Sequence, residues 1–289
     1  MEPNWDRDGD ASQPRSAVTV QEDRAIARIT TVALQERKSV GEKIAMLTAY
    51  DYPTAKLIDQ AGIDIILVGD SCGMAVMGRK DTLGVTMDEM IHHTKMVSAA
   101  VENALVVADM PFLSYQVRPE DALRNAGRFI AEAGAQAVKL EGPADKFGDA
   151  IAAILRAGIP VMGHIGLLPQ SVNQIGGYKI QGRSTESRAR LKEEAQGLEA
   201  IGCFAIVFEC IPADLAAEIT DLVSIPTIGI GAGAGCDGQV LVMHDMLGWG
   251  FTKFTKTFAD VKGLMHEAFA GYVREVKDGA FPAEEHTFT

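Results

Sequence analysis

The 289-residue chain is poor in aromatic residues, in cysteine and in basic charge. Aromatic side chains make up 6 % of it, and its four cysteines are scattered without a CxxC pair, which argues against disulfides and a zinc site. The formal net charge is −12, and such a surface repels nucleic acid and anionic membranes. No apolar run is long enough to predict a membrane span. We therefore expect no nucleic-acid partner and no membrane partner.

The first residues, MEPNWDRDGDASQPR, are acidic and match neither a signal peptide nor a transit peptide. We expect a disordered acidic tail over residues 1–24 and a cytoplasmic location. Residues 25–289 contain no Pro/Ser-rich linker and no change of composition. We expect them to form one domain with a helical extension at the C-terminal end.

What the sequence does contain is a regular alternation of apolar runs of strand length with helical patterns. A capping box of Thr86 and Glu89 and repeated Ala-Gly endings mark the helices, the last expected over residues 258–277. An α/β fold with about eight such repeats predicts a closed (β/α)8 TIM barrel, with an open doubly wound sheet as the alternative. The expected strands are rich in Val, Ile and Leu and cover residues 43–51, 63–70, 104–111, 137–142, 159–166, 203–210, 225–233 and 239–247.

Ionisable residues end successive apolar runs, and the segment AVKLEG is the most unusual of them. Side chains alternate across a strand, so Lys139 and Glu141 share one face while Val138 and Leu140 share the other. We expect the apolar pair to face the helices and the charged pair to face the barrel axis. The second to sixth strands end in a set that a closed barrel would bring to one pocket: Asp70, Asp109, Lys139 with Glu141, His164 and Glu209.

The residue types in this set indicate a hard-cation site and enolate chemistry. Asp70, Asp109 and Glu141 offer oxygen ligands, which favour Mg²⁺ over Zn²⁺. Lys139 supplies a positive charge for the carboxylate or enolate oxygen of a 2-oxo acid. Glu209 is the candidate base for a carbon-bound proton. His244 and Asp245, expected at the end of the eighth strand, are weaker candidates for the same pocket.

Two connections, residues 71–85 and 166–184, are unusually long for a compact domain and both follow strands. Their position predicts functional loops at the catalytic face of a barrel. The second carries glycines, a tyrosine, Lys179 and Arg183, and we interpret it as a possible lid.

From about Thr30 onward the chain resembles the ketopantoate hydroxymethyltransferase family. The resemblance rests on the motifs TAYDYPTAKL, LVGDSCGM, ADMPF, VKLEG, GHIGLLPQSVNQIGGYKIQG, FECIP, IGIGAG and GAFPAEEHTF. It implies a (β/α)8 barrel that transfers a hydroxymethyl group from 5,10-methylenetetrahydrofolate to 3-methyl-2-oxobutanoate, giving 2-dehydropantoate. It also implies one Mg²⁺ per subunit and a homo-oligomer, often a decamer.

The resemblance further implies a role for each matching residue. Asp70 and Asp109 are expected to bind the metal, with Glu141 beside them, and Glu209 is expected to remove the C3 proton. The expected contacts of the oxo acid are Asp70, Ser71, Asp109, Lys139 and His164.

Three alternatives stay open at this point. A Mg²⁺-dependent lyase or mutase of the isocitrate lyase and phosphoenolpyruvate mutase type would use the same enolate logic on another acid. A Schiff-base aldolase would use Lys139 as nucleophile. A protein that only binds an oxo acid would need no base at all.

Overall fold

The computed structural model describes residues 28–250 and 252–288, so the tail expected over residues 1–24 lies outside the described residues. Eight parallel strands close into a barrel in chain order, and the last strand pairs with the first. This confirms the (β/α)8 barrel, and the open doubly wound sheet is wrong. The strands are β1 (Ile44–Thr48), β2 (Ile65–Val68), β3 (Leu105–Asp109), β4 (Ala137–Lys139), β5 (Val161–Gly166), β6 (Ala205–Glu209), β7 (Thr227–Ile230) and β8 (Gly238–Leu241).

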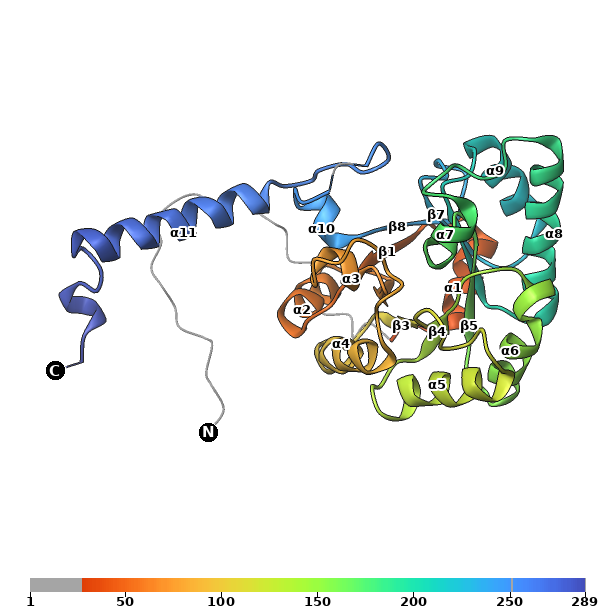
Figure 1. Cartoon of the computed structure of the whole chain (residues 1–289), viewed down its shortest axis with the longest axis horizontal. Helices are drawn as coiled ribbons and strands as arrows, with labels where there is room; N and C mark the ends of the chain where they lie inside the picture. Colours follow the sequence, from red (N-terminus) through yellow and green to blue (C-terminus); the bar gives the residue numbers. More distant parts are fainter. Residues whose placement is uncertain (1–27, 251, 289) are drawn as a thin grey trace.

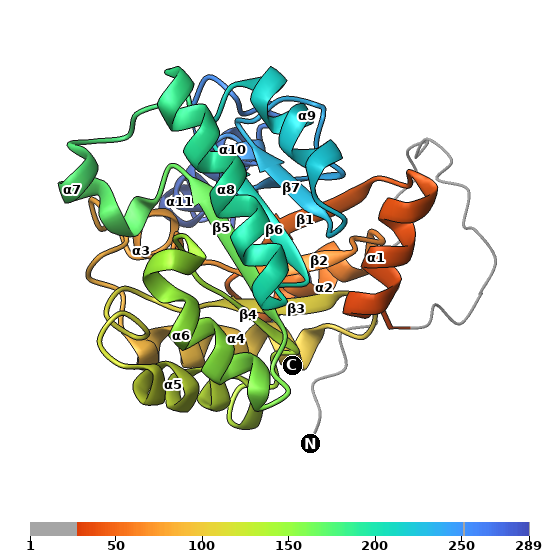
Figure 2. The same ribbon diagram turned by 90° about the vertical axis from the view of Figure 1, so that its right-hand side faces the viewer.

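Helices surround the strands (Figure 1). They are α1 (Thr31–Val40), α2 (Tyr52–Gln60), α3 (Cys72–Ala75), α4 (Met87–Ala100), α5 (Pro119–Ala131), α6 (Ala144–Arg156), α7 (Val172–Ile175), α8 (Thr185–Ile201), α9 (Ala213–Leu222), α10 (Met243–Met246) and α11 (Val261–Asp278), with short 3-10 helices η1 (Pro169–Ser171) and η2 (Glu284–His286). The turned view of Figure 2 shows α6 and α8 outside β5, against which both pack. Within residues 28–250 and 252–288, no helix combines the length and apolarity needed to cross a bilayer.

Local sequence signals explain where most of these helices begin and end. Thr86 and Glu89 form the expected capping box at the start of α4. Gly134 and Gly158 have φ values of 74° and 80°, the left-handed conformation that glycine adopts readily after a helix. The helix α5 begins at Pro119, because proline suits the first turn, where its missing N–H is not needed.

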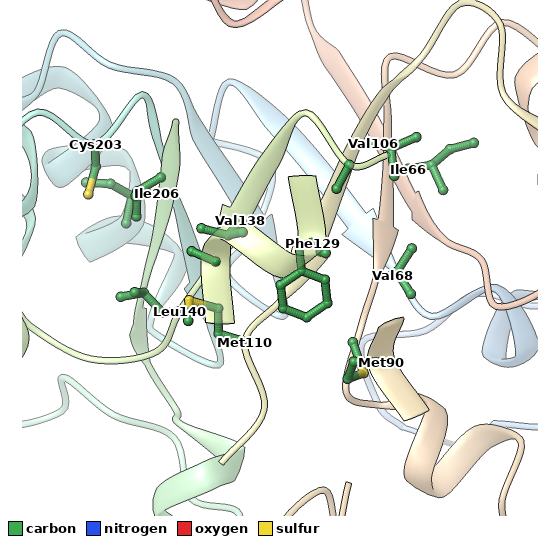
Figure 3. Close-up of a cluster of buried hydrophobic side chains, with 14 of the residues drawn as sticks. Ile66, Val68, Met90, Val106, Met110, Phe129, Val138, Leu140, Cys203 and Ile206 are labelled. Atoms are coloured by element: carbon green, nitrogen blue, oxygen red, sulfur yellow. The ribbon is translucent and has the colours of Figure 1, made fainter. Parts of the chain in front are cut away.

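The alternation expected around AVKLEG is present and separates two apolar layers. Val138 and Leu140 belong to the layer between strands and helices, together with Phe129 of α5 (Figure 3). Ala137 belongs to a second apolar cluster inside the barrel, and Lys139 follows it on the same face. The charged pair therefore lies on the axial side of the strand, as the sequence predicted.

The C-terminal helix α11 extends away from the barrel (Figure 1). Asp260 caps it by accepting a hydrogen bond from Gly263 N, so it begins at Val261 rather than at residue 258. Every residue of α11 is exposed or only partly buried, including Phe269 and Tyr272, which are 61 % and 60 % exposed. An apolar helix of this length in water is marginal by itself, because most helical stability comes from packing of an apolar face.

Candidate active site

A cavity of about 470 Å³ opens where the strands end. Its floor is formed by side chains from β2 to β6 and the residues that follow these strands. All of the residues that the sequence assigned to the site line it: Asp70, Ser71, Asp109, Lys139, Glu141, His164 and Glu209. The convergence follows from the closed sheet, which brings the carboxyl ends of all strands to one mouth.

Lys139 is the buried cation of the cavity floor. Its Nζ donates a hydrogen bond to Asp109 Oδ1, and Asp109 Oδ2 accepts one from the backbone N–H of Asp70 at 3.2 Å. Burial alone would lower the pKa of Lys139, but the charges of the neighbouring carboxylates outweigh it and raise that pKa above its usual range. The lysine is therefore a fixed positive charge at neutral pH.

The carboxylates Asp70, Asp109 and Glu141 are all buried and outnumber the one buried ammonium group of Lys139 among them. Burial and the charge of Asp109 raise the pKa of Asp70 to about 7. Burial and the charge of Asp70 raise the pKa of Glu141 well above its usual range. When all three carboxylates are ionised, they exceed the one ammonium group by two negative charges, and the raised pKa values of Asp70 and Glu141 reflect this excess. A divalent cation carries the charge that would neutralise it.

His164 lies between two glutamates. Its Nε2 is 3.4 Å from Glu209 Oε2, and its Nδ1 is 3.7 Å from Glu141 Oε1. Within the described chain neither ring nitrogen has a partner with hydrogen-bond geometry, although both are buried. Burial and the charge of Lys139 lower the pKa of His164, which keeps the imidazole neutral. A neutral imidazole whose two ring nitrogens lack partners can form hydrogen bonds with a ligand in the cavity.

Ser71 and Glu209 complete the expected set on opposite sides of the barrel. Ser71 Oγ lies 2.9 Å from the hydroxyl of Tyr50, which holds the serine at the start of α3. The Glu209 side chain is 18 % exposed, more than the carboxylates of the floor. A glutamate at this rim can exchange protons with a substrate and with water.

Two residues expected at the end of the eighth strand do not lie there. The strand β8 ends at Leu241, and both His244 and Asp245 lie in the short helix α10. Asp245 still lines the cavity, whereas His244 packs against the ring of Tyr50 with centroids 5.6 Å apart. The strand expectation was wrong because the apolar run of Val242 and Met243 continues into a helical turn.

Sequence reasoning missed Gln170, which connects two of the expected carboxylates. Its side-chain Nε2 donates to Asp70 Oδ2 at 2.9 Å, and its backbone N–H donates to Glu141 Oε2 at 3.0 Å. Gln170 lies in η1 within the long connection 166–184, away from any strand end. The only available signal was that this connection is long and follows a strand.

The outer half of the cavity has a different chemistry from its floor. It is lined by apolar and aromatic side chains from the loops after β2, β5 and β8, including Met74, Tyr178, Ile180 and Phe254. Tyr178 is 52 % exposed and Phe254 40 %, so both rings present uncovered surface. Lys179, beside Tyr178, adds a positive charge to this apolar rim.

Among residues 28–250 and 252–288, no three His, Cys, Asp or Glu side chains are grouped so that they could hold a metal ion by themselves. Magnesium, however, is commonly bound through one or two carboxylates, with water and substrate oxygens completing its shell. The neighbouring carboxylates Asp70 and Asp109, with the surplus negative charge of the floor, fit that smaller requirement. The donor set is therefore compatible with Mg²⁺ bound jointly by protein and substrate.

Solved structures similar to this chain share its fold. One is a phosphonopyruvate hydrolase in complex with oxalate and Mg++, with a TM-score of 0.60 and 14 % identity, covering 89 % of this chain and 92 % of that chain. Another is a 2,3-dimethylmalate lyase of the PEP mutase/isocitrate lyase superfamily, with a TM-score of 0.57 and 17 % identity, covering 89 % and 91 %. Likeness at these identities is evidence for the fold alone.

Sequence comparisons are far closer. Residues 28–284 match the model of the family described as ketopantoate hydroxymethyltransferase. A protein of Syntrophomonas wolfei called 3-methyl-2-oxobutanoate hydroxymethyltransferase is 57 % identical over 267 residues, which cover 91 % of this chain and 96 % of the relative. A protein of the same name from Clostridium novyi is 59 % identical over 263 residues, covering 90 % and 95 %. The chain therefore belongs to the ketopantoate hydroxymethyltransferase family of enzymes.

Proposed function

We propose that this enzyme transfers a hydroxymethyl group from 5,10-methylenetetrahydrofolate to 3-methyl-2-oxobutanoate and forms 2-dehydropantoate, a step of pantothenate biosynthesis. Family membership supports the reaction class. The observation that carries the proposal is the buried floor with its surplus negative charge, which faces the more exposed Glu209 across one cavity. Removing a carbon-bound proton from a 2-oxo acid requires a base that takes the proton, and it requires charged groups that stabilise the resulting enolate. Glu209 and the buried floor would supply these.

In the proposed site, Asp70 and Asp109 would hold one Mg²⁺, and Glu141 would be the third carboxylate beside them. This assignment is supported by the raised pKa values of Asp70 and Glu141, because a cation would favour their ionised forms. When bound, the ion supplies Lewis-acid polarisation of the ketone oxygen.

The proposed contacts of the oxo acid are the polar groups of the floor. Lys139 provides the positive charge for the substrate carboxylate or for the oxygen that becomes negative on enolisation. Ser71, with its hydroxyl fixed by Tyr50, and His164, with two unused ring nitrogens, provide hydrogen bonds. Because these groups are already fixed and buried, they stabilise developing charge without first having to reorganise.

The proposed chemistry begins at Glu209. Its carboxylate takes the C3 proton, and the electron pair of the C3–H bond becomes the enolate C2=C3 bond. The C3 carbon then bonds to the folate methylene carbon as one of the two bonds of that carbon to nitrogen breaks. Water replaces the second nitrogen and supplies the hydroxyl group of the product, and tetrahydrofolate leaves with one proton from Glu209 and one from water. His164, between Glu209 and Glu141, is positioned to hydrogen-bond the protonated glutamate.

Enolisation has a direct test that needs no folate. We expect the wild-type enzyme with Mg²⁺ to exchange the C3 proton of 3-methyl-2-oxobutanoate for deuterium in D₂O, followed by proton NMR. The same protein after exhaustive chelation serves as the control and should not exchange. Equal exchange rates in the two samples would argue against the metal part of the proposal.

The outer half of the cavity is the proposed place of the reduced folate. A cavity of about 470 Å³ lies within the range of roughly 300–1,000 Å³ that holds drug-sized ligands, more than a five-carbon acid needs. The exposed rings of Tyr178 and Phe254 suit a planar pterin, and Lys179 suits the acidic tail of a folate.

Replacing Tyr178 with alanine should therefore raise KM for methylenetetrahydrofolate about tenfold, because stacking on an aromatic ring contributes about 1–3 kcal/mol. Deuterium exchange at C3, measured without folate, should stay at the wild-type rate. Tyr52→Ala, which removes an exposed tyrosine from α2, is the matched control and should change neither quantity. Loss of exchange in Tyr178→Ala would show that this side chain serves the oxo acid instead.

A homo-oligomer is also proposed, and the C-terminal helix supports it. The apolar stripe of α11 comprises Leu264, Met265, Phe269, Tyr272, Val273 and Val276, all exposed. On the outer face of the barrel, Ala45 of β1 and Gln239 of β8 are exposed too. We propose that α11 packs its stripe against another copy of the chain, with the decamer as the expected assembly.

Phe269→Glu should consequently shift the protein to smaller species, seen as a lower mass in sedimentation velocity. The charge would have to be buried in the interface, which costs several kcal/mol. Arg274→Glu places the same side chain at an exposed position on the opposite side of α11 and should leave the mass unchanged. A wild-type protein that sediments as a monomer would contradict the oligomer.

The alternatives are less well supported. The lyase and mutase structures are only 16–17 % identical to this chain, against 51–59 % for the hydroxymethyltransferases. A Schiff base on Lys139 needs an uncharged amine, whereas the raised pKa keeps this lysine protonated. The cytoplasmic location and the division into a tail and one extended domain stay predictions from the sequence.

A further inference from the structure

The side chain of Gln170 is buried behind the residues that line the cavity, and its amide has polar partners on both sides. Its Nε2 donates to Asp70 Oδ2 and to the carbonyl of Met110, each at 2.9 Å. Its Oε1 accepts from the hydroxyl of Tyr115 at 2.9 Å and from Gln116 Nε2 at 3.0 Å. Both amide hydrogens therefore have acceptors, whereas the single hydroxyl hydrogen of Tyr115 is shared between Gln170 Oε1 and the carbonyl of Glu141, each at 2.9 Å. The chemistry of these partners allows only one orientation of the amide.

We propose that Gln170 is a positioning residue that sets the Asp70 carboxylate for cation and oxo-acid binding. The inference rests on the role given to Asp70 in the proposed function. The fixed donor of Gln170 occupies Asp70 Oδ2, which leaves the other carboxylate oxygen for ligands. The backbone N–H of Gln170 holds Glu141 in the same way, at 3.0 Å, so one residue fixes two carboxylates.

Gln170 also joins these carboxylates to the long connection 166–184. It lies in η1, directly before α7, and the same connection carries Tyr178 and Lys179 to the outer half of the cavity. A loop attached to the floor through a buried glutamine has a defined position before any ligand arrives. One residue thus links the carboxylates of the floor to the connection that forms the outer rim.

The test compares Gln170→Met with Gln116→Met in the full-length protein, with Mn²⁺ as the probe and its binding followed by electron paramagnetic resonance. Methionine keeps the length of glutamine but removes its donors. A hydrogen bond to a charged group is strong enough that its loss should weaken Mn²⁺ binding by about ten- to a hundredfold. Gln116→Met touches the same amide but no carboxylate, and should change the affinity less than about twofold.

Circular dichroism and thermal unfolding check that both variants are folded. Should Gln170→Met fail to fold, Gln170→Asn keeps the amide on a chain one methylene shorter and should weaken Mn²⁺ binding in the same way. An affinity equal to that of the wild type in a folded Gln170 variant would overturn the inference and leave the proposed function intact. Failure of the wild type itself to bind Mn²⁺ would overturn both.

Discussion

Replacing Glu209 with glutamine is expected to abolish deuterium exchange at C3 of 3-methyl-2-oxobutanoate, with a loss of about 10²- to 10⁴-fold. The amide has the shape of the carboxylate but cannot accept a proton. Glu209 lies at the partly exposed rim and outside the buried floor, so the substitution should leave the carboxylates and Lys139 in place. Binding of the oxo acid, measured by calorimetry, should therefore persist.

The control for this experiment is Glu193→Gln, which makes the same change at an exposed position of α8 and should exchange at the wild-type rate. Retained exchange in Glu209→Gln would reject this residue as the base. Loss of both exchange and binding would indicate that Glu209 holds the substrate rather than its proton.

Lys139→Met should be the most damaging change to the floor. It removes the one ammonium group from among three buried carboxylates, and breaking a buried ion pair in this way costs about 3–5 kcal/mol of unfolding free energy. Exchange at C3 should be lost as well, because no fixed cation remains for the anionic substrate. Lys95→Met, at an exposed position of α4, should affect neither property.

The stability loss in Lys139→Met should depend on pH in a defined direction. Burial raises the folded-state pKa of Asp70 from 3.8 to about 7, so stability from this group is full at low pH and declines as pH rises through that interval. Removing Lys139 raises the pKa of Asp70 further, so the decline in stability extends to higher pH. In denaturant unfolding, the free energy of unfolding of Lys139→Met should fall further below that of the wild type at pH 8 than at pH 5. Equal differences at the two pH values would contradict the charge balance described for the floor.

The sequence predicted the barrel and its floor because both follow from periodicity. Strands alternate with helices along the chain, and closing such a sheet brings every strand end to one mouth. Within AVKLEG, the period of two is enough to separate Lys139 and Glu141 from Val138 and Leu140. Charged residues at strand ends were therefore sufficient to locate Asp70, Asp109 and Glu209.

Features outside that periodicity could not be predicted. Gln170 and Tyr178 lie in a connection of 19 residues, where no repeat relates sequence position to direction in space. The sequence predicted a last helix over residues 258–277, but a helical pattern does not say which surface covers its apolar stripe. The residues after Leu241 continue its apolar run, and an apolar run fits a strand or a helix equally well. The end of β8 and the start of α10 could therefore not be predicted from the sequence.

The most direct test of the central claim is a product assay with 3-methyl-2-oxobutanoate, 5,10-methylenetetrahydrofolate and Mg²⁺. Mass spectrometry should detect 2-dehydropantoate only when all three are present with the enzyme, and Glu209→Gln should form none above the uncatalysed background. Undiminished product after exhaustive chelation would contradict the role of the carboxylate floor. Conversion of the oxo acid without folate into a cleaved or rearranged product would instead make the enzyme a lyase or mutase.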